Sequence, residues 1–286
     1  MIGKFRFLAA LAALAALGAE ATCDLSMDAR ADALPEYVLN GQDCLASLPE
    51  GYAFDEGVEL AIARLINAER TERGLPELDI RIELRDAARW HSLDMSANDF
   101  FAHMGLDDRL PATRITAFDR TLLSSVQREN IAAIKGAIDW DSVAGRLHEG
   151  LMDSPSHREA ILADDVTHLA IGVVKRPNGI WLTELFVRQD GAFERPVPLS
   201  IAAGTLVDQP ADLTGWTGSG LALRQKGKVT DLKTRGGATG RIPASASGVY
   251  ALTVRGEQPG PTENSCRYMH FSGPRVLIVK RDEKSS

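Results

Sequence analysis

The run HLAIGVVKRPNGIWLTELFV, His168 to Val187, decides the fold of the residues around it. It holds two apolar runs, residues 168–174 and 180–187, joined by Lys175-Arg-Pro-Asn-Gly. Short runs rich in β-branched and aromatic residues favour strands, and an Asn-Gly pair between them is typical of a tight hairpin turn. The sequence therefore predicts an antiparallel strand pair here.

Helical patterns precede this hairpin. Apolar residues recur at helical spacing from Phe54 onward, with Arg70 off the apolar face, and Gly74 closes the pattern as a C-terminal glycine commonly does. A second helix is predicted to end near Phe100, a third spans about residues 141–152, and residues 107–135 are less regular. The apolar faces of the first two consist of Val58, Ile62, Leu65, Ile66, Leu84, Ala87, Ala88, His91 and Met95. Helices followed by an antiparallel pair favour an α/β/α or α+β fold.

Two segments flank this region, which we assign to a domain at residues 52–192. Residues 22–51 show no sustained period and contain Pro35, Gly41 and Pro49, so we interpret them as an extended leader. After a proline-containing stretch that begins at Glu194, short strand patterns alternate with glycine-rich turns. Residues 198–286 are therefore predicted to form a small all-β, sandwich-like domain.

The N-terminus is typical of an export signal. Lys4 and Arg6 precede an Ala/Leu run that ends in Ala19-Glu20-Ala21, which predicts a signal peptide at residues 1–21. A retained membrane anchor is the alternative, but the apolar run from Phe7 to Gly18 is short for a bilayer span. We expect a periplasmic or extracellular protein whose mature chain has no transmembrane segment.

The charge distribution argues against polyanionic partners. The formal net charge of the 286 residues is −7, and signal removal makes the chain one charge more negative. No block of Lys and Arg interrupts this acidic sequence. Nucleic acid and anionic membrane surfaces are therefore not expected as main partners.

Three cysteines leave two interpretations open. Cys23 and Cys44 can form a disulfide with Cys266 free, or Cys23 can carry a lipid anchor while Cys44 pairs with Cys266. An oxidising compartment allows either arrangement. The cysteine spacing does not indicate a zinc site.

Common hydrolase motifs are missing from the sequence. His148-Glu149 begins an HExxH pattern, but Met152 takes the place of its second histidine. No GxSxG motif is present, and neighbouring residues such as Ser156 and His157 point about 100° apart on a helix. Neither metalloprotease nor serine-hydrolase chemistry is indicated by local motifs.

The stretch SPSHREAIL, Ser154 to Leu162, is typical of a helix start. Ser154 before Pro155 fits an N-cap with proline at the first helical position, and Ser156 and Glu159 have capping-box spacing. His157 then lies in the first turn, where the helix dipole disfavours the imidazolium. A neutral imidazole is the form that binds metal ions.

Several motifs occur in order between about residues 55 and 190. They are Asn67-Ala-Glu-Arg, Gly74-Leu-Pro-Glu-Leu, Ala88-Arg-Trp-His-Ser-Leu-Asp-Met, Phe101-Ala-His, Glu129-Asn-Ile-Ala, Ser154-Pro-Ser-His-Arg-Glu-Ala-Ile-Leu and the hairpin from Ile171 to Phe186. Together they resemble the CAP superfamily of cysteine-rich secretory, antigen 5 and pathogenesis-related proteins, also called the SCP domain, in its bacterial form. The resemblance implies an α-β-α sandwich, hence an α+β chain with a C-terminal all-β domain.

The resemblance also implies a cleft in which two histidines and two acidic residues bind a divalent cation, often zinc. His103 and His157 match the histidines and Glu129 matches the first acid. Ser154 takes the position expected of the second acid, for which Asp153 or Glu149 could substitute. Arg128 replaces a glycine of the family pattern, and Leu151 replaces a tryptophan. Two histidines and one carboxylate still suffice for a three-ligand zinc site with an open position.

Two functions follow from this resemblance. In the first, the protein is an exported binding module whose cleft holds a lipid, glycan or peptide. In the second, it is a metal-assisted hydrolase of peptides or cell-wall material in which Glu129 acts as the base. We favour the first, because the sequence offers no second catalytic acid.

Overall fold

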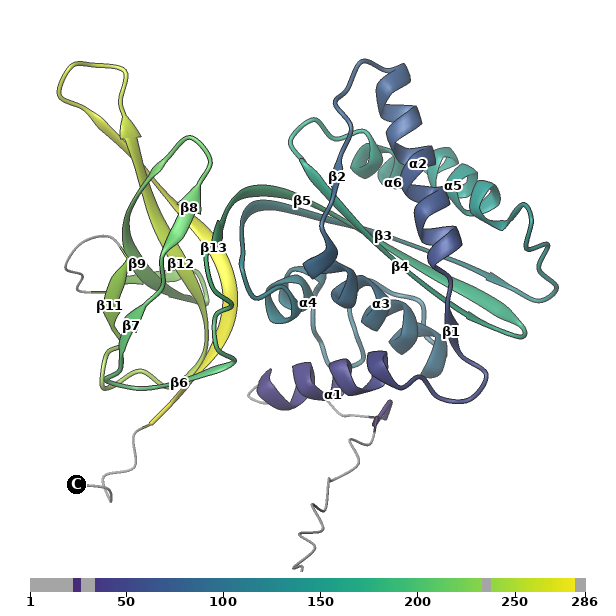
Figure 1. The fold of residues 1–286 in the computed structure, drawn as a ribbon, viewed down its shortest axis with the longest axis horizontal. Coiled ribbons are helices and arrows are strands. Elements are labelled where there is room, and N and C mark those ends of the chain that lie inside the picture. The colour runs from purple at the N-terminus through teal and green to yellow at the C-terminus, as the bar shows by residue number, and fades with distance from the viewer. Residues whose placement is uncertain (1–22, 27–33, 233–237, 281–286) are drawn as a thin grey trace, which may run out of the picture.

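The computed structural model describes residues 23–26, 34–232 and 238–280 (Figure 1). The expected signal peptide at residues 1–21 lies outside these ranges. The helices within them are α1 (Leu34–Ala46), α2 (Glu56–Glu72), α3 (Ile82–Ala97), α4 (Pro111–Phe118), α5 (Val143–Asp153) and α6 (Pro155–Ile161). Helices α2, α3 and α5 lie where the apolar periodicity predicts them.

A sheet separates two groups of helices. Its N-terminal part has the strand order β1-β4-β5-β3, and β2 pairs with β4 in parallel while the other pairs are antiparallel. The strands are β1 (Ala53–Phe54), β2 (Asp79–Ile80), β3 (Leu122–Lys135), β4 (His168–Arg176) and β5 (Gly179–Phe193). Helices α2, α5 and α6 cover one face, and α1, α3 and α4 cover the other (Figure 1). The predicted hairpin and the α-β-α sandwich are therefore confirmed.

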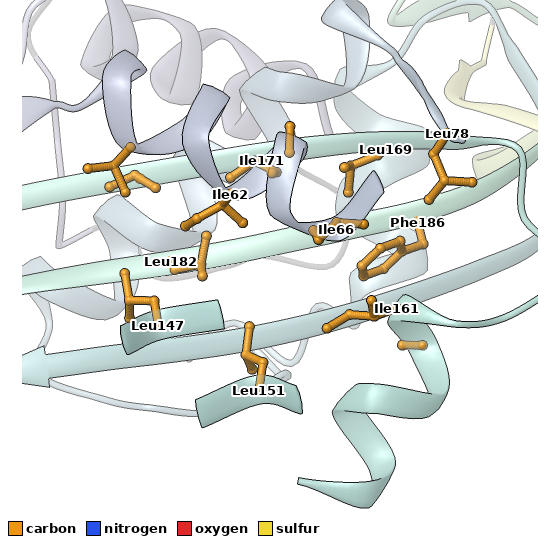
Figure 2. Close-up of a cluster of buried hydrophobic side chains, with 14 of the residues drawn as sticks. Ile62, Ile66, Leu78, Leu147, Leu151, Ile161, Leu169, Ile171, Leu182 and Phe186 are labelled. Carbon is orange, nitrogen blue, oxygen red and sulfur yellow. The ribbon is translucent and has the colours of Figure 1, made fainter. Parts of the chain in front are cut away.

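Alternating side chains of β4 and β5 supply both cores. Leu169, Ile171, Leu182 and Phe186 point toward α2, α5 and α6, as Figure 2 shows. Ala170, Val174, Leu185 and Val187 face α1, α3 and α4 instead. This two-sided burial explains why the hairpin forms near-continuous apolar runs, since neither face of these strands meets water.

Residues 107–135 are more ordered than their sequence indicates. They contain α4 and the 14-residue strand β3, which pairs with β5 from Leu122 to Lys135. Polar residues from Ser125 to Arg128 are exposed or half-buried, and the register shifts twice near Ser124. These features remove the two-residue alternation by which a strand is recognised.

The predicted extended leader is wrong over much of its length. Residues 34–46 form α1, whose buried side places Leu34, Tyr37, Val38 and Cys44 at helical spacing. Gly41 hides this period, because the ring of Phe118 lies only 2.5 Å from where a Cβ would be. A disulfide joins Cys23 to Cys44 and Cys266 is free, so the first of the two cysteine arrangements is the one present.

The prediction that Arg70 faces outward is also wrong. Its side chain is fully buried, and Nη1 donates to the carbonyls of Ile161 and Ala163 at 2.8 Å each. Nε donates to the carbonyl of Pro76 at 2.9 Å. Arg70 thereby fixes the C-terminal end of α6 against α2, which a periodicity argument that treats arginine as exposed cannot find.

The C-terminal part is all-β, as predicted, and extends the same sheet. Its strands are β6 (Ser200–Ala202), β7 (Leu206–Asp208), β8 (Ala211–Leu213), β9 (Thr217–Gln225), β10 (Lys228–Asp231), β11 (Thr239–Arg241), β12 (Gly248–Pro259) and β13 (Cys266–Val279). The order continues β3-β13-β12-β9-β10, with Ser272 of β13 opposite Ser124 of β3. This part has an apolar core of its own, which includes Leu223, Leu252 and Phe271. The boundaries at residues 192 and 198 stay predictions.

Candidate functional site

His103 and Glu129 form the centre of the candidate site. His103 lies in the loop after α3 and Glu129 lies on β3, yet Nδ1 of His103 is 2.9 Å from Oε1 of Glu129. The Glu129 side chain is 2% exposed, whereas that of His103 is 49% exposed. A carboxylate only accepts hydrogen bonds, so Nδ1 of a neutral His103 carries the proton and Nε2 keeps its lone pair. The pair thus presents a free imidazole nitrogen.

Arg114 occupies the second oxygen of Glu129. Its Nη2 donates to Oε2 at 2.7 Å and also to the carbonyl of His103 at 2.8 Å. Both side chains of this ion pair are almost completely buried. Arg114 therefore neutralises Glu129 and fixes the loop that carries His103. The sequence did not indicate this residue, because α4 was not recognised there.

His91 supports the same loop from α3. Its Nε2 lies 3.0 Å from the carbonyl oxygen of Ala102 and 3.9 Å from Oε1 of Glu129. Burial, and then the positive charge of Arg114, hold the pKa of His91 well below its usual value. His91 is therefore neutral and donates from Nε2, which makes it a structural residue next to the site.

His157 completes the group of three residues expected from the sequence. It lies half-buried on α6, and burial, followed by the positive charge of His103, lowers its pKa. The expectation of a neutral imidazole agrees with this direction, but burial is the main cause in place of the helix dipole. Nδ1 of His157 is buried and has no hydrogen-bond partner among the described residues.

A buried acid lies behind His157. Asn130 donates through Nδ2 to the carbonyl of His157 at 3.0 Å and to Oε2 of Glu184 at 3.1 Å. Burial raises the pKa of Glu184 to about 7, and its Oε1 has no partner in the described part of the chain. Glu184 was predicted only as a strand residue, and its position between apolar neighbours is the one signal that marked it as unusual.

The residues considered for the second acid lie elsewhere. Glu149 and Asp153 are exposed on α5, and no hydrogen bond or ion pair between described residues joins them to His103 or Glu129. Ser154 ends α5 and begins α6 with Pro155 in its first turn, as predicted, but makes no capping hydrogen bond with its side chain. Ser154 thus has a structural role as the junction of two helices.

The predicted three-ligand zinc site stays a prediction. Both oxygens of Glu129 already have partners, and the described residues contain no group of three or more histidine, cysteine or acidic side chains placed to hold a metal ion. The imidazoles of His103 and His157 are the groups that could still bind one. Glu129 fits the role of a carboxylate that orients a ligating histidine.

Exposed apolar side chains occur close to His103 in the sequence. Four large ones occur within ten residues: Phe101 is 54% exposed, Met104 47%, Leu106 67% and Leu110 55%. Isolated exposed apolar residues are ordinary, but a concentration of them is typical of binding surfaces. This loop can therefore contact the apolar part of a ligand.

Comparison with known proteins defines the class of this domain. Residues 63–186 match the sequence profile of the Cysteine-rich secretory protein family, CAP. The motif order, the sandwich and this match agree, so this part of the chain is a CAP domain, also called an SCP domain. This domain belongs to the CAP superfamily, and similar domains occur in bacterial proteins.

Two relatives and one solved structure illustrate the similarity. "Uncharacterized membrane protein YlbC" of Bacillus subtilis is 30% identical over 136 residues, which are 46% of this chain and 34% of that protein. "Uncharacterized protein YkwD" of the same organism is 32% identical over 129 residues, 45% of this chain and 46% of the relative. An extracellular protein containing a SCP domain from Bacillus anthracis matches with 28% identity and a TM-score of 0.41, over 47% of this chain and 41% of that one. The chain thus covers less than half of each of these proteins.

Among the described residues, no helix is both long and apolar enough to cross a bilayer.

Proposed function

We propose that this protein is an exported binding module whose ligand contacts His103 and His157. One observation supports this most strongly: the buried carboxylate of Glu129 lies 2.9 Å from Nδ1 of the exposed His103 imidazole, which leaves Nε2 free for a ligand. The charge of His103 also lowers the pKa of His157, and exposed apolar side chains lie in the same loop as His103. A polar centre beside apolar surface suits a ligand with both characters, such as a lipid or a peptide.

A divalent cation, with zinc as the best candidate, fits the polar part of this proposal. His103 would bind through Nε2, since Nδ1 donates to Glu129. The lowered pKa of His157 keeps its imidazole neutral, as metal binding requires. Two imidazoles leave open positions for a polar group of the ligand, but they bind zinc more weakly than the three or four ligands of ordinary protein sites.

Export rests on two observations. The N-terminal sequence has the layout of a signal peptide, and the Cys23–Cys44 disulfide suits an oxidising compartment. Periplasmic or extracellular placement therefore belongs to this proposal. The disulfide ties Cys23 into the fold, which argues against a lipid anchor on its sulfur.

Calorimetric titration of metal-free protein with Zn²⁺ tests the site. We expect saturable heat for the wild type and its loss in a His103→Ala/His157→Ala double variant. His148→Ala/His270→Ala is the matched control, because it removes two histidines outside the site and should leave the heat unchanged. Identical heats for the wild type and the first double variant would contradict the proposal.

A hydrolase remains the second candidate because of the His103–Glu129 pair. A histidine held through Nδ1 by a carboxylate, with Nε2 free, has the geometry of a general base and its orienting group. In such an enzyme His103 would take the proton and Glu129 would position it. Turnover of a peptide or cell-wall substrate by the wild type that is lost in Glu129→Gln would favour this candidate. If the wild type turns over no substrate in a broad panel, the binding module is favoured.

A further inference from the structure

A groove separates the CAP domain from the C-terminal strands. Its volume is about 1030 Å³. Ala112 and Thr116 of α4 and Gln127 of β3 form one wall, and the other is formed by β12, β13 and the turn between β9 and β10. None of the residues that line it belongs to the His103 site, so the groove is a second place where a ligand could bind.

Two arginines face this groove from one row of the sheet. Ala251 of β12 pairs with Arg224 of β9 on one side and with Arg275 of β13 on the other. Directly paired residues project from the same face, and two strand spacings separate the arginines by about 10 Å at the backbone. Since alanine is the residue between them, the row leaves an opening with a guanidinium on each side.

The groove carries positive charge that no acidic residue of its described lining balances. Arg224, Lys226 and Arg275 line it, and no acidic residue does. Within the described ranges no ion pair reaches any of these three side chains, although the protein as a whole has a net charge of −7. Among the described residues, Arg275 donates only to the hydroxyl of Thr113, at 3.3 Å.

The protein residues that the structure describes leave donor atoms of both arginines unpaired. The Nε atoms of Arg224 and Arg275 are both buried without a hydrogen-bond partner in the described part of the structure. Both arginines line the groove, so their guanidinium groups remain available to an acceptor that enters it.

We propose that this groove binds an oxyanion, a phosphate or carboxylate group, between Arg224 and Arg275. Guanidinium groups bind both kinds of anion through paired hydrogen bonds, and two of them can hold a doubly charged group. Val249 lies two residues before Ala251, and its strand partner Leu277 lies two residues after Arg275. Both project from the same face as Ala251 and Arg275 and also line the groove. The ligand therefore has an anionic group and an apolar part that contacts these two side chains.

Titration of the full mature chain with inorganic phosphate and, separately, with citrate tests this site. Constant ionic strength removes general charge screening from the comparison. We expect saturable binding of at least one anion, weakened by about tenfold or more in Arg224→Gln and in Arg275→Gln, since each variant loses charge-assisted hydrogen bonds. Tighter phosphate binding would identify a phosphate ester as the ligand, and tighter citrate binding a carboxylate.

Arg188→Gln is the matched control, because Arg188 is half-exposed on β5, pairs with Asp190 and does not line the groove. The affinity of Arg188→Gln for either anion should equal that of the wild type. Arg275→Gln could disturb the contact with Thr113, and Arg224→Gln, which has no such contact, keeps the test valid in that case. Absence of saturable binding by either anion, or equal affinities in Arg224→Gln and Arg188→Gln, would overturn the proposal.

Discussion

Gly172→Ala is expected to lower the free energy of unfolding of the CAP domain by about 3 kcal/mol or more. Overpacking a core costs typically about 1–3 kcal/mol, and a clash with backbone atoms lies at the upper end of this range. A Cβ at this position would lie 2.2 Å from the backbone nitrogen of Arg89 and 2.3 Å from the carbonyl carbon of Ala88. Both atoms belong to α3, so no side chain can rotate away. Unfolding in urea, followed by circular dichroism and tryptophan fluorescence, measures the loss.

Gly145→Ala is the control for this prediction. Gly145 lies in α5, where an added Cβ meets no atom within 4 Å. Alanine is the better helix former by about 1 kcal/mol, so this variant should be as stable as the wild type or slightly more stable. Equal unfolding midpoints for Gly172→Ala and the wild type would show that α3 does not pack directly on β4.

Glu184→Gln is expected to be about 3 kcal/mol more stable than the wild type at about pH 8, but only about 1 kcal/mol more stable at about pH 5. Burial raises the pKa of Glu184 from 4.5 to about 7. Below pH 4.5 the carboxyl is protonated in both the folded and the unfolded state. Between these values only the folded state keeps the proton, so wild-type stability falls as the pH rises and levels off above about pH 7.

Glutamine reproduces the protonated carboxyl and cannot ionise. Its amide oxygen can accept the hydrogen bond from Asn130 that Oε2 accepts now. The pKa of Asp94 is also raised, to about 6, and that of His91 is lowered, but both groups remain in the variant and cancel in the comparison. Chemical denaturation at the two pH values decides the matter, and a difference between variant and wild type that does not change with pH would contradict the buried, neutral state of Glu184.

The sequence predicts those helices that have one apolar and one polar face, and the hairpin whose turn residues are characteristic. Helices α2, α3 and α5 follow from apolar periodicity, and the hairpin follows from Asn178-Gly179 between apolar runs. Strand β3 and helix α1 escape prediction because half-buried polar residues or a glycine pressed against Phe118 disguise their periods. A glycine within a strand suggests close approach by another segment, but only the structure shows that α3 is the segment that meets Gly172.

The site is partly predictable for a similar reason. The motifs locate His103, Glu129 and His157, and the structure places His103 against Glu129. The motifs do not reveal the neighbours of these residues: Arg114 donates a hydrogen bond to one oxygen of Glu129. Arg114, His91 and Glu184 act through contacts between segments far apart in the chain, and no local pattern records such contacts.

The most direct test of the binding site is nuclear magnetic resonance of protein with ¹⁵N-labelled histidines. Without metal, at near-neutral pH, we expect the ring of His103 to show the Nδ1–H tautomer that the bond to Glu129 requires. On addition of Zn²⁺ the ring signals of His103 and His157 should shift together, while those of His148, His168 and His270 stay in place. An Nε2–H tautomer for His103, or a zinc-induced shift that leaves both His103 and His157 unchanged, would contradict the proposed site.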